Sequence, residues 1–182
     1  MSDDLSEFTR FPTPQDFSAF QQMMLRIPYI DIMVELNPGL GDTTVEFARK
    51  FKRVFAIGLW KPTNDIVVNA AVENEFDKAI SSFSNVTKLK VHTVEGLSQF
   101  LDDSIHFVYV GGYKSSYGET RQNIINWLPK IKKNWFIGGN QYQRISRIPQ
   151  APSDVSKAIE ELLYPIHQKF ADGSFLKKKG VY

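Results

Sequence analysis

The sequence of 182 residues contains no cysteine, which excludes disulfide bonds, thiolate metal sites and a cysteine nucleophile. It also lacks a large charge of either sign: the net charge is +2, which favours neither nucleic acid nor an anionic membrane as a partner. No stretch approaches the roughly 18 apolar residues that cross a bilayer, and the acidic start "MSDDLSEF" lacks the features of a secretion signal. We therefore expect a protein of the cytoplasm or of a soluble assembly, with no nucleic-acid and no membrane partner.

What the sequence does contain is a regular alternation of strand-like and helix-like segments. Apolar runs typical of buried parallel strands occupy 29–36, 53–60, 87–94, 105–112 and 134–140. Segments with helical spacing occupy 14–28, 43–51, 64–83, 95–101, 117–131 and 153–163. A glycine-containing hairpin signal follows at 167–180, where lysines predict a solvated edge strand. The alternation predicts an α/β fold, a three-layer sandwich around a mostly parallel sheet.

The turn after the first strand, "VELNPGLGD", is the first candidate for a binding site. In a doubly wound sheet the ligand lies beyond the carboxyl ends of the strands, and Gly39 and Gly41 allow backbone amides to approach it. Asp42 or Thr43 is expected to cap the helix that follows. Glu35, just before the turn, would repel phosphate and suits a sulfonium or ammonium ligand better than NAD. The alternative is that the glycines only permit a tight strand–helix turn.

Several stretches together resemble the small class I S-adenosylmethionine-dependent methyltransferases. The matching segments are "VELNPGLGDTT", "GLWKP", "DDSIHFVYVGGYK", "NWLPKIKKNWFIGGNQY" and "VSKAIEELLYPIHQKFADGSFLKKK", and the similarity spans residues 30–179. The resemblance implies a Rossmann-like seven-stranded sheet with an antiparallel last strand. It also implies an N-terminal arm and helix at 1–29, followed by one methyltransferase-like domain at 30–182.

The same resemblance implies which positions would contact S-adenosylmethionine. They are the residues of the first turn and the ends of the next strands, namely Glu35, Asn37, Gly39, Gly41, Thr43, Gly58, Thr93 and Gly111. It names no catalytic residue. The methyl acceptor that it implies is a small molecule or a sugar.

Departures from the family pattern fall on the polar and ionisable positions. Gly58 stands where a carboxylate usually binds the ribose hydroxyls, and Gly111 and Lys114 stand where Asp and His are usual. Other departures are Asn37 for the first glycine, Asn123 for Asp, His106 for Asp, Asn134 and Trp135 for Gly-Gly, and Asn140 and Gln141 for His-Asp. Losing the hydrogen bonds between a carboxylate and the ribose hydroxyls weakens cofactor binding by roughly 10- to 100-fold. We expect S-adenosylmethionine binding to be weakened or lost, and we expect no metal, because the rim lacks the carboxylates that magnesium needs.

A general base is hard to find in this sequence. Of the three histidines, His92 lies nearest the expected cofactor side, His106 is expected to be structural and His167 solvated. Trp60 and Trp135 are aromatic side chains that can stack on an adenine, although packing is the more common role.

Two functions follow from these observations. One is a catalytically degenerate methyltransferase-like protein that serves as a binding or structural module, with protein partners or a second copy of itself. The alternative is an active methyltransferase, because transfer from a sulfonium proceeds by positioning alone. The coordinated replacements at 58, 111, 114, 140 and 141 favour the first.

Overall fold

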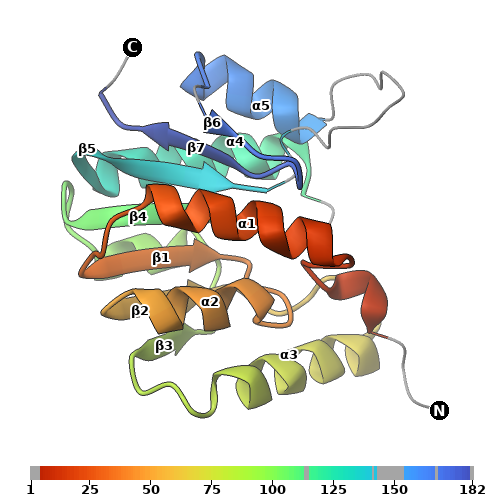
Figure 1. Ribbon diagram of the computed structural model, residues 1–182. Helices are drawn as coiled ribbons and strands as arrows, with labels where there is room; N and C mark the ends of the chain where they lie inside the picture. Colours follow the sequence, from red (N-terminus) through yellow and green to blue (C-terminus); the bar gives the residue numbers. More distant parts are fainter. Residues whose placement is uncertain (1–4, 113–114, 141, 143–153, 167, 181–182) are drawn as a thin grey trace.

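The computed structural model describes residues 5–112, 115–140, 142, 154–166 and 168–180. One sheet has the strand order β3-β2-β1-β4-β5-β7-β6 (Figure 1). The bounds are β1 (Ile32–Leu36), β2 (Arg53–Ile57), β3 (Val86–Leu89), β4 (Ile105–Val110), β5 (Ile131–Gly139), β6 (Gln168–Lys169) and β7 (Phe175–Lys178). Strands β1 to β5 are parallel, and β7 is antiparallel to both of its neighbours. The predicted seven-stranded, mostly parallel sheet is confirmed.

Helices cover both faces of this sheet, as the parallel strands require. The helices α1 (Pro14–Arg26), α2 (Asp42–Lys50) and α3 (Ile66–Ile80) lie over one face, while α4 (Tyr117–Trp127) and α5 (Asp154–Leu163) lie over the other (Figure 1). Among the described residues, three short 3-10 helices span Ser6–Phe8, Glu95–Gln99 and Leu128–Lys130. The result is the expected three-layer sandwich.

Alternation along β1 sets the direction of its side chains. Val34 and Leu36 pack into the core beneath α4 and α5, whereas Met33 packs against α1 and α2. Glu35 shares the face of Met33 because successive strand residues point to opposite sides. A carboxylate at this position therefore faces helix α2.

The hairpin near the end of the described chain differs from its prediction. The expectation of a solvated edge strand at 176–180 is wrong, because β7 lies between β5 and β6. Lys177 is buried, and its Nζ donates to the Pro165 carbonyl at 2.9 Å. The sequence pattern of lysines did not distinguish an edge strand from a strand next to the edge.

Candidate functional site

A pocket of about 470 Å³ opens at the carboxyl ends of the parallel strands. The chain leaves β1 toward β2 and β3 on one side and returns to β4 on the other, so the strand order reverses beside β1. Ligands of open α/β sheets bind at such a switch point. The wall comprises Phe8, Asn37, Pro38, Gly39, Leu59, Trp60, Lys61, Pro62, Val72, His92, Thr93, Val94, Gly112, Ser115, Glu119, Gln122 and Asn123.

The β1–α2 turn forms the floor of this pocket. Gly39 and Gly41 both have left-handed backbone angles, with φ of 60° and 93°, which glycine adopts without strain. Asn37 is also left-handed, and its N–H donates to the Ile57 carbonyl at 2.8 Å. Gly41 is the N-cap of α2 and offers no side-chain cap, so the prediction that Asp42 or Thr43 caps this helix is wrong.

Glu35 and Thr43 lie beneath the turn and not on the pocket wall. The Glu35 side chain is enclosed, with the residue only 1% exposed, and it accepts hydrogen bonds from the Thr43 and Thr44 hydroxyls, the latter at 2.6 Å. Burial raises the pKa of Glu35 to about 7, although the two threonine hydrogen bonds oppose that shift. The expectation that Glu35 faces a cationic ligand is therefore corrected: this carboxylate ties β1 to the first turn of α2.

The strand-end glycines are fixed by close packing against the same turn. A Cβ on Gly58 would lie 3.3 Å from Pro38 Cδ and 3.4 Å from Asn37 Cα. The turn thus presses against the place where a ribose-binding carboxylate would begin. The N–H of Gly111 donates to the Leu36 carbonyl at 3.1 Å and joins β4 to the end of β1.

Thr93 and Asn123 form the wall opposite the turn. The Thr93 hydroxyl donates to Asn123 Oδ1 at 2.7 Å, which links the segment after β3 to helix α4. His92 lies beside Thr93 and is exposed at the rim. Of the eight predicted contact residues, the pocket wall brings together Asn37, Gly39 and Thr93. Their role in ligand binding stays a prediction.

The N-terminal arm, residues 5–13, contributes a wall that the sequence did not indicate. Phe8 lines the pocket and packs in one cluster with Trp60, Val72 and Phe76. The Phe8 carbonyl lies 3.9 Å from the position of a Cβ on Gly39. The arm therefore crosses directly over the glycine turn.

Buried polar contacts hold this arm in place. The Arg10 guanidinium donates to Asp172 at 2.5 Å and to Ser174 at 2.8 Å, and its Nε lies 3.4 Å from the Tyr109 hydroxyl. The Arg10 backbone N–H donates to Asp42 Oδ2 at 2.7 Å. One residue of the arm thus connects β4, the β6–β7 hairpin and the start of α2.

Trp60 and Trp135, both considered as adenine-stacking residues, have different positions. Trp60 lines the pocket with a left-handed backbone, packs on Phe76 and carries Lys88 Nζ over its ring at 4.7 Å. Trp135 does not line the pocket: it packs edge-on to His106 in the neighbouring strand.

Several expected site residues remain structural or fall outside the described chain. His106 Nδ1 accepts a hydrogen bond from the Ile32 N–H at 3.4 Å. Burial, together with the nearby Lys132, lowers the pKa of His106 below its usual range. Lys114, Gln141 and His167 lie outside the described residues. Within the described part of the chain, no group of three His, Asp or Glu side chains is placed to hold a metal ion.

Sequence reasoning missed several wall residues, above all Phe8, Lys61 and Glu119. A signal existed for Glu119: "SYGE" is a capping box, and the Ser116 hydroxyl accepts from the Glu119 N–H at 3.2 Å while the Glu119 carboxylate accepts from the Ser116 N–H at 3.1 Å. No local pattern pointed to Phe8, because its position depends on the path of the arm over the sheet.

No family model and no curated protein matches this chain. Solved structures resemble it in fold. Phosphoethanolamine N-methyltransferase 1 of Haemonchus contortus has a TM-score of 0.61 at 13% identity over 97% of this chain and 47% of its own, so the chain spans about half of that enzyme. Precorrin 8w decarboxylase of Methanobacterium thermoautotrophicum has a TM-score of 0.61 at 17% identity, covering 96% and 97%. An rRNA methylase of Streptococcus thermophilus has a TM-score of 0.59 at 13% identity, covering 93% and 99%.

The chain therefore has the fold of class I S-adenosylmethionine-dependent methyltransferases. Likeness at this level of identity defines the architecture and leaves the reaction open, since one fold carries many chemistries. Among the described residues, no helix combines the length and the apolar character needed to span a membrane.

Proposed function

We propose that this protein is a catalytically degenerate methyltransferase-like protein that uses its strand-end pocket as a binding module for an adenosyl compound. One observation carries the proposal: the carboxylates around the described pocket are already bound by donors of the protein itself. Glu35 accepts from two threonines, and Asp42 accepts from Thr9 and Arg10. Glu119, on the wall, accepts from Ser116.

The placement of these carboxylates bears on binding because a ribose diol is held by an acceptor that faces the pocket, and of the three only Glu119 lies on the pocket wall. A charge-assisted hydrogen bond of this type contributes about 1.5–3 kcal/mol. Gly58 has no side chain, and the adjacent turn crowds the space above it. S-adenosylmethionine is therefore expected to be held weakly, through the turn and the Thr93–Asn123 wall.

An active methyltransferase is the second candidate, and the open pocket favours it. A volume of about 470 Å³ falls in the range of small-molecule sites. Methyl transfer from a sulfonium needs alignment of acceptor and donor more than proton transfer. His92 at the rim is a side chain that a methyl acceptor could meet.

Calorimetric titration with S-adenosylmethionine and its demethylated product separates these candidates. We expect dissociation constants weaker than about 100 μM and no methyl transfer to a panel of small hydroxyl and amine acceptors. Micromolar binding with turnover would establish the active enzyme instead. No heat at millimolar ligand would exclude the binding module.

A matched pair of variants locates the binding. Thr93→Val removes the hydrogen bond to Asn123 from the pocket wall, whereas Thr87→Val makes the same change at an exposed position of β3. We expect the first to weaken binding several-fold and the second to leave it unchanged. Equal effects would place the ligand elsewhere.

A further inference from the structure

Glu119 is the one carboxylate among the described residues of the pocket wall. Its Oε2 accepts from the Ser116 hydroxyl at 3.0 Å and from the Ser116 N–H at 3.1 Å. These contacts belong to the capping box that begins α4. Its Oε1 has no hydrogen-bond or ion-pair partner among the described residues. Glu119 therefore offers one carboxylate oxygen to a ligand in addition to its contacts with the helix cap.

Asn123 supplies hydrogen-bond donors next to this oxygen. It follows Glu119 by four residues in α4, so the two side chains lie on the same side of the helix, one turn apart. Asn123 Oδ1 accepts from the Thr93 hydroxyl at 2.7 Å, which leaves the two amide N–H bonds of Asn123 for a ligand. Both residues line the pocket. The α4 side of the wall thus combines an acceptor with donors.

A pair of neighbouring hydroxyl groups matches this combination better than an ion does. Each hydroxyl donates one hydrogen bond and accepts others, so a vicinal diol can use the Glu119 oxygen and the Asn123 amide together. An ammonium group brings donors only and leaves the Asn123 N–H bonds unmatched, whereas a phosphate brings acceptors and is repelled by Glu119. Lys61 on the same wall offsets the charge of Glu119, so the wall favours a ligand of neither sign.

The apolar part of the wall comes from other elements than the α4 part. Its large apolar members belong to the N-terminal arm, to the segment after β2 and to α3, and they are Phe8, Leu59, Trp60, Pro62 and Val72. Helices α3 and α4 lie over opposite faces of the sheet (Figure 1). A nucleoside has the same division, because its base is flat and largely apolar while its sugar carries the hydroxyls.

We propose that Glu119 binds the ribose diol of the adenosyl ligand, with Asn123 donating to the same hydroxyls. The proposal rests on the adenosyl-binding function proposed above and adds a specificity-determining residue to that site. The base then lies toward Phe8 and Trp60. The contact to the diol comes from α4 and not from the end of β2, where Gly58 has no side chain.

Calorimetry of the full chain with adenosine and 2′,3′-dideoxyadenosine tests the contact to the diol. The two nucleosides carry the same base and differ in the hydroxyls that Glu119 would bind. We expect adenosine to bind about 5- to 10-fold tighter, because a hydrogen bond to a charged group is stronger than one between neutral groups. Equal affinities would overturn the inference and leave the adenosyl pocket in place.

The variant Glu119→Gln supplies the test at the level of the residue. Glutamine also completes a capping box, so its oxygen can stay with Ser116 while its amide N–H bonds replace Oε1. We expect the affinity for adenosine to fall about 5- to 10-fold, to that of the dideoxynucleoside. The affinity for the dideoxynucleoside itself should stay unchanged, which a role in the helix cap alone would not produce.

Asp16→Asn is the matched control, because it makes the same change at the third position of the capping box of α1. Asp16 Oδ2 accepts from the Thr13 N–H at 3.2 Å, and Asp16 is not part of the pocket wall. This variant should keep both wild-type affinities. Thermal melts of both variants check that they fold.

The outcomes separate this inference from the proposed function. An equal loss of affinity for both nucleosides in Glu119→Gln would show that Glu119 acts through the helix cap, and the contact to the diol would be refuted. A variant that keeps the wild-type preference for adenosine would refute it as well. If neither nucleoside nor S-adenosylmethionine binds the wild-type chain, both proposals are wrong.

Discussion

Glu35 is the residue whose environment differs most from its sequence-based interpretation. The folded protein holds its proton up to about pH 7, whereas an ordinary glutamate releases its proton near 4.5. Between these values the folded state binds a proton that the unfolded chain has lost, so stability falls as pH rises through this window. The gap corresponds to roughly 3 kcal/mol at about 1.4 kcal/mol per pH unit. Above pH 7 Glu35 is ionised in both the folded and the unfolded state, and the whole cost of burying its charge is then lost from the stability of the fold.

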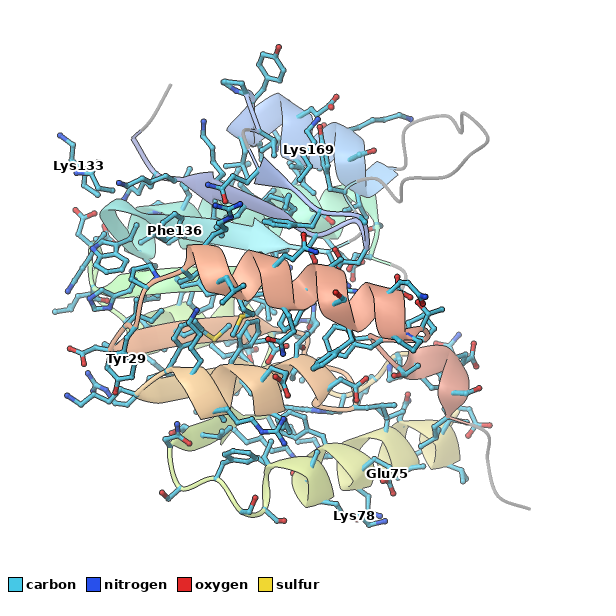
Figure 2. The ribbon with its side chains drawn as sticks, in the orientation of Figure 1. Tyr29, Glu75, Lys78, Lys133, Phe136 and Lys169 are labelled. Atoms are coloured by element: carbon cyan, nitrogen blue, oxygen red, sulfur yellow. The ribbon has the colours of Figure 1, made fainter. Side chains whose placement is uncertain are left out.

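Glu35→Gln removes this titration and keeps the shape of the side chain. Its amide can accept from one threonine and donate to the other. We expect urea unfolding to show a variant whose stability relative to wild type rises between pH 5 and pH 8. Glu75→Gln, in α3 where the half-exposed Glu75 pairs with Lys78, should retain the wild-type pH dependence (Figure 2). Parallel curves for wild type and Glu35→Gln would contradict the assignment.

Among the elements, the N-terminal arm depends on one buried ion pair. Arg10→Met keeps much of the side-chain volume but leaves Asp172, whose side chain is fully buried, without its cation. Removing one partner of a buried pair costs about 3–5 kcal/mol, and the Ser174 N–H and hydroxyl that also bind Asp172 favour the lower end. Hydrogen exchange should accelerate in residues 5–12, because Arg10 holds the arm against the sheet.

The matched control is Arg121→Met, which breaks an exposed pair with Glu161 between α4 and α5. Exposed pairs contribute at most about 1 kcal/mol, so the urea unfolding midpoint of Arg121→Met should shift little. Hydrogen exchange in the arm should stay slow in this variant. If both variants lose similar stability, the arm is held by its apolar contacts and the Arg10 network has no special role.

The order of the elements could be predicted because buried parallel strands and amphipathic helices leave different periodicities in sequence. The residues at which these elements end could not be predicted in the same way. The predicted strand 53–60 stops at Ile57, where Gly58 begins the loop to a left-handed Trp60 that lines the pocket. A pocket does open at the predicted glycine turn, and its use as a binding site stays a prediction. The direction of Glu35 depends on how β1 packs against α2. The contributions of Phe8 and Lys61 depend on the path of the N-terminal arm and of the loop after β2, and neither segment has a sequence period.

At the scale of the whole molecule, α1 belongs to the same core as the sheet. Phe20, Met23 and Met24 pack with Met33 of β1 and Phe107 of β4. Strands β1 and β4 also supply Val34 and Val108 to the core under α4 and α5. Because the two cores share these strands, we expect the segment 1–29 and the domain 30–182 to unfold in one cooperative transition.

Met23→Ala tests this coupling from the helix that lies outermost in sequence. Met23 is fully buried, so the truncation should cost about 2–5 kcal/mol. Tryptophan fluorescence, whose three reporters all lie in 30–182, should move to lower urea together with the helical circular dichroism. Leu25→Ala in the same helix removes a side chain that is 81% exposed and should change stability by less than about 0.5 kcal/mol. A loss of helical signal in Met23→Ala at an unchanged fluorescence midpoint would show that α1 is a separate unit, and the shared strands would then not couple the two faces of the sheet.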